Sequence, residues 1–250
     1  MISAIILTKN NQDIIEDCIN SLEGLVDEII IVDDGSEDKT LELVKVFTQK
    51  IYKIEDKDFS YRRNYGAEKA NGDWLLYVDT DEKVDQKLKK EIKEAINSHE
   101  FVAYAIPRKN ILLGKELKHG GWWPDYVLRL IKKESLIKWE GKLHEQPKIK
   151  GEVGKLINPL IHTSHRTLSE MVDKTNKWSE VEASLLFEAN HPKVYWWRFI
   201  TIAFREFWYR GILKLGFLDG TTGIIEIIYQ IYSRMITYVK LWEMQIQSIK

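Results

Sequence analysis

The sequence of 250 residues contains a single cysteine, Cys18, and this excludes a disulfide framework. A lone cysteine fits a reducing compartment. The net charge is −1, so no general attraction to nucleic acid follows. No run supplies the roughly twenty uncharged apolar residues of a membrane-spanning helix, and the first residues show no basic segment or cleavage site, so we expect no signal peptide. These absences favour a cytoplasmic protein without a nucleic-acid partner.

The composition is that of a folded protein, with 44% hydrophobic and 30% charged residues. Short apolar runs at 3–8, 28–32, 51–54 and 74–78 alternate with helical patterns. Strands that alternate with helices at this spacing predict βαβ units and a mostly parallel sheet, and hence an α/β fold. From Thr167 onward the pattern stays helical, so we predict a change of domain near 164–169.

The most informative stretch is the apolar run 74–78 and the acidic cluster that follows it. Asp79, Asp81 and Glu82 would lie beyond the carboxyl end of a buried strand, where open α/β sheets bind ligands. Three neighbouring carboxylates repel one another unless a cation neutralises them. Oxygen ligands of this kind suit Mg²⁺ or Mn²⁺ carrying a substrate phosphate. Taken alone, the cluster also fits a solvated turn before a helix that starts near Asp85.

Four motifs occur in order along the first half: Ser3-Ala-Ile-Ile-Leu-Thr-Lys-Asn10, Val32-Asp-Asp-Gly-Ser-x-Asp-x-Thr40, Arg63-Asn64-x-Gly66-x-x-x-Ala70-x-Gly72-Asp-Trp and Val78-Asp-Thr-Asp-Glu82. Together they resemble the family 2 glycosyltransferases, which have the GT-A fold. The second half resembles the lipopolysaccharide-core glucosyltransferase branch of that family. This second likeness rests on Pro107-Arg-x-Asn110, Gly114-x-x-x-x-His119-Gly-Gly-Trp, Pro124-Asp-Tyr-x-x-Arg-Leu130, His144-Glu145 and Gly216-Phe-Leu-Asp-Gly220.

The resemblance implies a metal-dependent inverting glycosyltransferase. Such an enzyme would move a hexose, with glucose as the first candidate, from a nucleotide-sugar, in particular a UDP-sugar, to a glycan or lipid-linked acceptor. The setting would be the synthesis of cell-envelope polysaccharide or of the lipopolysaccharide core. A GT-A catalytic domain would cover 1–165, with a nucleotide-sugar half over about 1–100 and an acceptor half over about 101–165, and an aromatic-rich helical region would cover 166–250.

Several residues would bind the donor by resemblance. A carboxylate of Asp33 or Asp34 would accept the imide N–H of a uracil ring, and the guanidinium of Arg63 would pair with the pyrophosphate. Thr8 and Asn10 would touch the base or the ribose. The residues by themselves also allow a tight turn after the second strand, helix capping, and a solvated helix face for the arginine. The full set of predicted donor-binding residues is Thr8, Asn10, Asp33, Asp34, Arg63, Asp79 and Thr80.

Asp79 and Asp81 are implied to hold the divalent ion, which offsets the charge that builds on the leaving diphosphate. His144 resembles the histidine that completes the metal site from a later loop. A lone histidine is often structural, and His162 and His165 compete for the same role.

An inverting transfer needs one base to take the proton of the acceptor hydroxyl. We predict Asp125 for this role, because bulky aromatics beside a carboxylate desolvate it and raise its basicity. Trp122 and Trp123 offer flat faces for an acceptor sugar. The alternative is that Asp125 pairs with Arg129 in a folded loop.

The helical region interleaves aromatic residues with arginines. Cations and aromatics together suit the headgroup layer of a membrane, so we predict a peripheral contact with the cytoplasmic face of the inner membrane. Packing on the catalytic domain and a homodimer interface are the alternatives. The residues concerned are Tyr195, Trp196, Trp197, Phe199, Phe204, Phe207, Trp208 and Tyr209, with Arg198, Arg205 and Arg210 between them.

Two other functions compete with this interpretation. A nucleotidyltransferase also uses carboxylates and a metal on an α/β sheet, but the turn after the first strand, 8–11, lacks the glycine-rich basic loop usual in that class. A non-catalytic scaffold at the membrane could bind a nucleotide-sugar without turnover. The joint presence of Asp79, Asp81, Asp125 and His144 speaks against an inactive site.

Overall fold

The structure is a computed structural model that describes residues 1–141 and 145–248. The chain forms two compact units. The first comprises Met1–Lys109 and Asp125–His162, and the second comprises Asn110–Pro124 and Thr163–Lys250. Residues 110–124 of the second unit are therefore inserted between two segments of the first unit, and the C-terminal helices follow from residue 163.

The first half of the first unit is a parallel sheet, as the apolar runs predict. Its strands lie in the order β3-β2-β1-β4, and each neighbouring pair is parallel. The helices between them are crossover connections of βαβ units. The elements are β1 (Ile2–Thr8), α1 (Ile15–Asn20), β2 (Glu28–Asp33), α2 (Thr40–Val44), β3 (Ile51–Lys53), α3 (Phe59–Lys69) and β4 (Trp74–Tyr77).

The second half of the sheet is largely antiparallel. Strand β8 (Asp125–Lys132) pairs antiparallel with β4, and β6 (Ala103–Leu112) pairs antiparallel with β8. The order then continues through β12 (Leu160–His165) to β5 (Glu82–Lys83). The remaining elements are α4 (Gln86–Ser98), β7 (Lys115–Glu116), a 3₁₀ turn (Lys133–Ser135), β9 (Leu136–Glu140), β10 (Gln146–Ile149) and β11 (Val153–Lys155).

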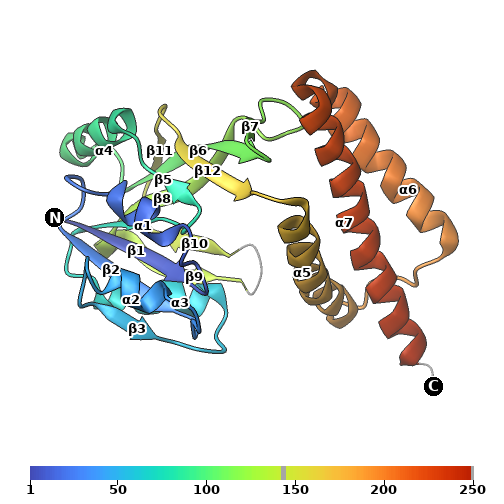
Figure 1. The fold of residues 1–250 in the computed structure, drawn as a ribbon, viewed down its shortest axis with the longest axis horizontal. Helices are drawn as coiled ribbons and strands as arrows, with labels where there is room; N and C mark the ends of the chain where they lie inside the picture. The colour runs from blue at the N-terminus through green and yellow to red at the C-terminus, as the bar shows by residue number, and fades with distance from the viewer. Residues whose placement is uncertain (142–144, 249–250) are drawn as a thin grey trace. The chain divides into compact units, whose positions relative to one another are not determined.

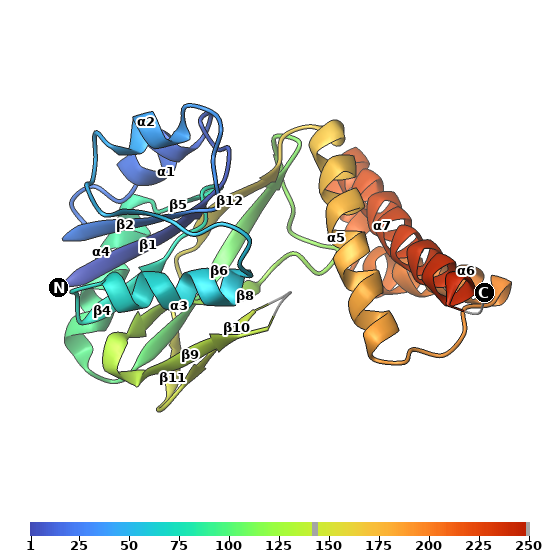
Figure 2. The same cartoon turned by 90° about the horizontal axis from the view of Figure 1, so that it is seen from below.

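The two faces of this sheet carry separate cores, because successive side chains of a strand point to opposite faces. Along β1, Ala4 and Ile6 pack with the apolar residues of α1, α2 and α4. Ile5 and Leu7 pack instead with α3 and with Trp139 of β9. Figure 2 shows α1 and α2 on one side of β1 and β2, and α3 on the other.

The second unit is built from helices, with α7 lying alongside both α5 and α6 (Figure 1). One small core joins Ala183, Val194 and Leu241. Among the described residues, no helix is long and apolar enough to cross a membrane. The elements are α5 (Leu168–Glu188), α6 (Trp196–Glu206), a π-helical segment (Phe207–Leu213), a 3₁₀ turn (Gly216–Asp219) and α7 (Gly220–Gln247).

Candidate functional site

The candidate site lies where the parallel strands end. Thr8 is paired in register with Asp33, and Ile5 with Tyr77, so β1, β2 and β4 finish at one edge of the sheet. Asp79 follows two residues after the end of β4. The sequence prediction that the acidic residues after β2 and β4 share an edge is therefore met by the register of the strands.

Asp33 is fully buried, and its carboxylate builds the turn after β2. One oxygen accepts the backbone N–H groups of Gly35 at 3.0 Å and Ser36 at 2.9 Å, and the Ser36 hydroxyl donates to the other oxygen. Gly35 has a φ of +77°, a conformation that favours glycine. The turn considered from sequence is thus present, and a role for Asp33 toward a nucleotide stays a prediction.

Thr8 and Asn10 connect the loop after β1 to the loop after β2. The Asn10 backbone N–H donates to the hydroxyl of Ser36 at 2.9 Å, and its side-chain oxygen accepts the N–H of Glu37 at 2.8 Å. The buried hydroxyl of Thr8 donates to the side-chain oxygen of Asn11 at 3.1 Å. These bonds fix the two loops against each other at the edge of the sheet.

Two consecutive arginines of α3 bind different carboxylates. The side chains of Arg62 and Arg63 are only 7% and 4% exposed, so neither lies on a solvated helix face. Arg62 Nη1 lies 3.1 Å from Asp34 Oδ2, while Arg63 donates to Asp79 Oδ1 at 2.9 Å and to Glu145 Oε1 at 2.8 Å. Burial lowers the pKa of Arg62, although Asp34 opposes the shift.

Arg129 brings a third guanidinium to the acidic cluster. It donates to Oε1 of the fully buried Glu82 at 2.7 Å and pairs with Asp79 Oδ2. The second oxygen of Glu82 accepts the backbone N–H of Asp79 at 3.0 Å. Burial raises the pKa of Asp79, but Arg129 and Arg63 outweigh it and hold that pKa well below its usual range. Burial lowers the pKa of Arg129, but the carboxylates of Asp79 and Glu82 outweigh it and raise that pKa. The charges of Asp79 and Glu82 are therefore neutralised within the protein by Arg63 and Arg129.

Asp81 has a different neighbour. Its Oδ2 lies 3.4 Å from Nε2 of His162 on β12, and Thr80 between the two aspartates is buried. Carboxylate and imidazole are donors that Mn²⁺ accepts. Within 1–141 and 145–248, no three His, Cys, Asp or Glu side chains form a group that could hold a metal ion. His144, the predicted third ligand, lies outside the described residues.

Asp125 is the first residue of β8 and stands opposite Arg108 of β6. Arg108 donates from Nε at 2.8 Å and from Nη2 at 2.7 Å to Asp125 Oδ2. The partner considered from sequence, Arg129, binds Asp79 and Glu82 instead. The side chain of Asp125 keeps 24% of its surface exposed, so it remains accessible to a substrate.

The two predicted acceptor residues, Trp122 and Trp123, belong to the second unit. Trp123 is 44% exposed, and the Trp122 carbonyl accepts the side-chain N–H of Asn110 at 3.1 Å. Each of the two side chains lies in the loop that leads directly into Asp125 along the chain.

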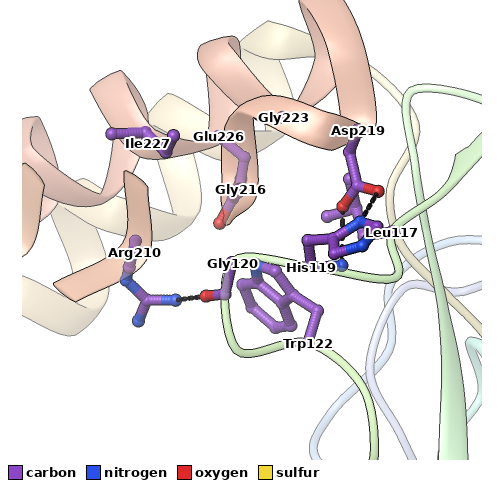
Figure 3. Close-up of a pocket in the computed structure, with 10 residues that line it drawn as sticks. All are labelled: Leu117, His119, Gly120, Trp122, Arg210, Gly216, Asp219, Gly223, Glu226 and Ile227. Atoms are coloured by element: carbon purple, nitrogen blue, oxygen red, sulfur yellow. Dashed lines mark hydrogen bonds and ion pairs between the residues drawn. The ribbon is translucent and has the colours of Figure 1, made fainter. Parts of the chain in front are cut away.

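Figure 3 shows how the loop containing Trp122 is held within the second unit. His119 Nδ1 lies 2.8 Å from Asp219 Oδ1, and the other oxygen of Asp219 accepts two backbone N–H groups of this loop. Arg210 donates to the carbonyl of Gly120 at 3.2 Å. The cavity there is about 10 Å³, which is room for about one water molecule and not for a sugar. The motifs at 114–122 and 216–220 therefore bind each other through His119 and Asp219 and stabilise this part of the second unit.

Sequence reasoning missed the roles of Arg129, Glu82 and Arg108 in the site. Arg129 reaches Asp79 because β8 runs antiparallel to β4, with Leu130 opposite Leu76. The sequence contains no sign of which strand β8 joins. The signal available was indirect, because Arg108 and Arg129 both lie in the motifs of the second half.

Comparisons with known proteins point in one direction. Residues 3–147 match the family model described as "Glycosyl transferase family 2". The lipopolysaccharide core biosynthesis glycosyltransferase LpsC of Rhizobium meliloti is 28% identical over 247 residues, which cover 90% of this chain and 88% of LpsC. The uncharacterized glycosyltransferase RT0209 of Rickettsia typhi is 24% identical over 259 residues, which cover 99% of this chain and 88% of RT0209.

Among solved structures, Staphylococcus aureus TarS 1–349 in complex with UDP-GlcNAc superposes with a TM-score of 0.50. The identity is 15%, and the match covers 99% of this chain and 92% of the TarS chain. This is a likeness of fold, and it confirms the predicted α/β class of GT-A type with a long C-terminal helix.

Proposed function

The chain belongs to glycosyl transferase family 2 and is a glycosyltransferase, and from that premise we propose that it transfers a hexose from a UDP-sugar to a glycan or lipid-linked acceptor. The observation that carries the donor assignment is the set of buried guanidiniums at the sheet edge. Arg62 Nε, Arg63 Nη1 and Arg129 Nε are buried donors without a partner among the described residues. Guanidinium donors match the oxygens of a diphosphate in geometry and charge. In this proposal Thr8, Asn10, Asp33, Asp34 and Thr80 complete the donor site.

We propose that Asp79, Asp81 and a histidine hold a divalent cation, Mg²⁺ or Mn²⁺. Both oxygens of Asp79 contact arginines, so an ion at Asp79 would compete with Arg63 and Arg129. His162 lies beside Asp81, and His144 is the second candidate. A bound ion would offset the charge that builds on the leaving diphosphate.

Asp125 is the proposed general base, and Trp122 and Trp123 the proposed acceptor platform. Arg108 grips one oxygen of Asp125 with two donors, which orients the carboxylate at the start of β8. A base of this kind takes the proton of the acceptor hydroxyl as that hydroxyl attacks the anomeric carbon, and inversion follows from the single displacement.

The proposed setting follows from the name of LpsC together with the lone cysteine. We propose an acceptor from the lipopolysaccharide core or another cell-envelope polysaccharide, with transfer in the cytoplasm, a reducing compartment. Glucose remains the first candidate for the hexose.

The experiment is a panel of UDP-sugars with Mn²⁺, read as nucleoside diphosphate release and as thermal shift. Asp81→Ala should abolish both the metal-dependent shift and the release while the apo protein stays folded, because the buried ion pairs of Asp79 and Glu82 with Arg129 do not involve Asp81. Asp73→Asn is the matched control, since its carboxylate is 75% exposed and lies at the other end of β4.

Three outcomes separate the candidate functions. Release of nucleoside diphosphate supports transfer of a sugar. Formation of UTP and a sugar phosphate from the UDP-sugar and added pyrophosphate would point to a nucleotidyltransferase, and a thermal shift without any turnover would point to a binding scaffold. Full turnover by Asp81→Ala in Mn²⁺ buffer would refute the metal assignment.

A further inference from the structure

A row of large apolar side chains is exposed along α6 and the π-helical segment that continues it. Trp196, Ile200, Phe204 and Trp208 recur at intervals of four and so share one side of the helix. Their exposed fractions are 74%, 61%, 64% and 47%, and the rings of Phe204 and Trp208 stack with centroids 6.0 Å apart. We call these four residues the aromatic face. Contiguous exposure of this kind marks an interaction surface.

The aromatic face is not the side by which α6 packs into its own unit. Ile202 is 2% exposed, and Phe199 packs against the core of Ala183, Val194 and Leu241. One side of the helix therefore packs against the core, and a second apolar side is exposed. A helix that is apolar on both sides needs a partner for the outer one.

The exposed charges of this stretch all have one sign. The two acidic residues are only 9% and 6% exposed, and both are paired, Glu206 with Arg205 at 3.5 Å and with Arg210, and Asp219 with His119. The basic residues lie at or partly at the surface, and Arg205 has a side chain that is 65% exposed. Between 193 and 222 the acidic residues are Glu206 and Asp219, and the basic residues are Lys193, Arg198, Arg205, Arg210 and Lys214.

We propose that the aromatic face lies in the headgroup layer of a bilayer that contains anionic phospholipid. Tryptophan and phenylalanine enter the boundary between headgroups and acyl chains, while arginines beside them meet the lipid phosphates. The four residues line one side of the helix, so the contact is peripheral, with the helix axis parallel to the bilayer surface. The proposal rests on elements outside the candidate site and does not depend on the proposed chemistry.

A second copy of the chain fits the same surface less well. Twofold dimers place one patch against itself. Arg205 and Lys214 would then meet the like charges of the partner copy, which disfavours the contact. Anionic lipid instead complements the aromatic face and the cations around it.

The test is flotation of the full-length protein with vesicles of phosphatidylcholine alone and of phosphatidylcholine mixed with phosphatidylglycerol. We expect binding to the mixed vesicles and a large loss of binding in Trp196→Ser/Phe204→Ser, about tenfold for each aromatic side chain removed. Arg205→Gln should weaken binding about fivefold, and salt should weaken it further.

The matched control is Ile157→Ser, which removes an apolar side chain that is 81% exposed on the first unit. It should leave binding unchanged. Circular dichroism and the unfolding midpoint establish that each variant is folded, and Arg205→Gln tests the surface even where the double variant is not. Equal binding to both vesicle types would overturn the assignment to anionic lipid. Absence of vesicle binding together with a dimer that the double variant disperses would assign the aromatic face to a second copy.

Discussion

Replacing Arg129 by methionine is the most direct test of how the acidic cluster is held together. Methionine keeps much of the length and apolar volume of the side chain but removes the charge and the donors. Arg129 is 5% exposed and binds Glu82, which is fully buried, together with Asp79. The substitution therefore leaves the buried carboxylate of Glu82 with a single, more distant counter-charge, Arg108 Nη1 at 4.0 Å.

The expected cost follows from that burial. Removing one partner of a buried ion pair destabilises a protein by about 3–5 kcal/mol, because the remaining charge stays desolvated. Glu82 keeps one hydrogen bond, from the backbone N–H of Asp79, and Asp79 keeps Arg63. We therefore expect Arg129→Met to lower the free energy of unfolding by about 3 kcal/mol at pH 7, near the lower end of this range.

The pH dependence of the free energy of unfolding tests the same ion pair in a second way. In the wild type, burial raises the pKa of Asp79, but Arg129 and Arg63 outweigh it and depress that pKa. This contribution to stability is present above the unfolded pKa of about 3.9 and is lost only in strong acid. Arg129→Met removes one of the two cations while burial remains, so the pKa of Asp79 should rise. The stability deficit of the variant should then shrink as the pH falls from about 5 to about 3, where Asp79 of the variant begins to bind a proton and Asp79 of the wild type does not.

The assay is urea denaturation followed by tryptophan fluorescence, across that range of pH. Lys132→Met is the control on the same strand, since Lys132 pairs with the exposed Glu134 at the surface and its loss should cost less than about 1 kcal/mol. Adding Glu82→Gln to Arg129→Met should recover part of the loss, because it removes the uncompensated charge. A loss in Arg129→Met no larger than that in Lys132→Met would refute the reasoning.

Three further predictions test other residues. Asp125→Asn keeps the shape of the side chain but cannot take a proton, so turnover should fall on the order of a hundred- to ten-thousand-fold with little change in donor KM. Near-normal turnover would show that another residue is the base, and Glu145→Gln is the variant to assay next. Asp33→Ala should weaken UDP-sugar binding by calorimetry while the Mn²⁺-dependent thermal shift persists; an unchanged dissociation constant would leave Asp33 as a turn residue only. Burial raises the pKa of Glu226 to about 7, so the free energy of unfolding of the wild type should fall by up to about 3 kcal/mol as the pH rises from about 4.5 to about 7. Urea denaturation of Glu226→Gln should not show this dependence on pH.

The parallel half of the fold could be predicted because its signals are local. Each strand is a short apolar run, each ends in polar residues, and parallel strands joined by helices must finish at one edge. That reasoning alone brings Thr8, Asp33 and Asp79 to one edge, and the register confirms it. The turn after β2 was also foreseeable, since Gly35 permits the positive φ that the turn requires.

The contacts within the site could not be predicted, because they depend on which strands become neighbours. The sequence does not reveal that β8 lies antiparallel beside β4, and without that pairing Arg129 cannot be assigned to Asp79. The two arginines of α3 posed a similar problem. Helical spacing suggests that neighbours point in different directions, but both Arg62 and Arg63 are buried because each finds its own carboxylate.

The two aspartates of the acidic cluster have unequal electrostatic surroundings, although they are only one residue apart. Asp79 is neutralised on both oxygens by arginines, whereas Asp81 faces His162. A cation and a guanidinium compete for the same lone pairs, so an ion that bound Asp79 would first have to displace Arg63 or Arg129 from it. An ion at Asp81 would leave the pairs of Asp79 with Arg63 and Arg129 in place. In the proposed reaction Asp81 would therefore receive the metal first, and Asp79 would join it only where Arg63 or Arg129 is displaced.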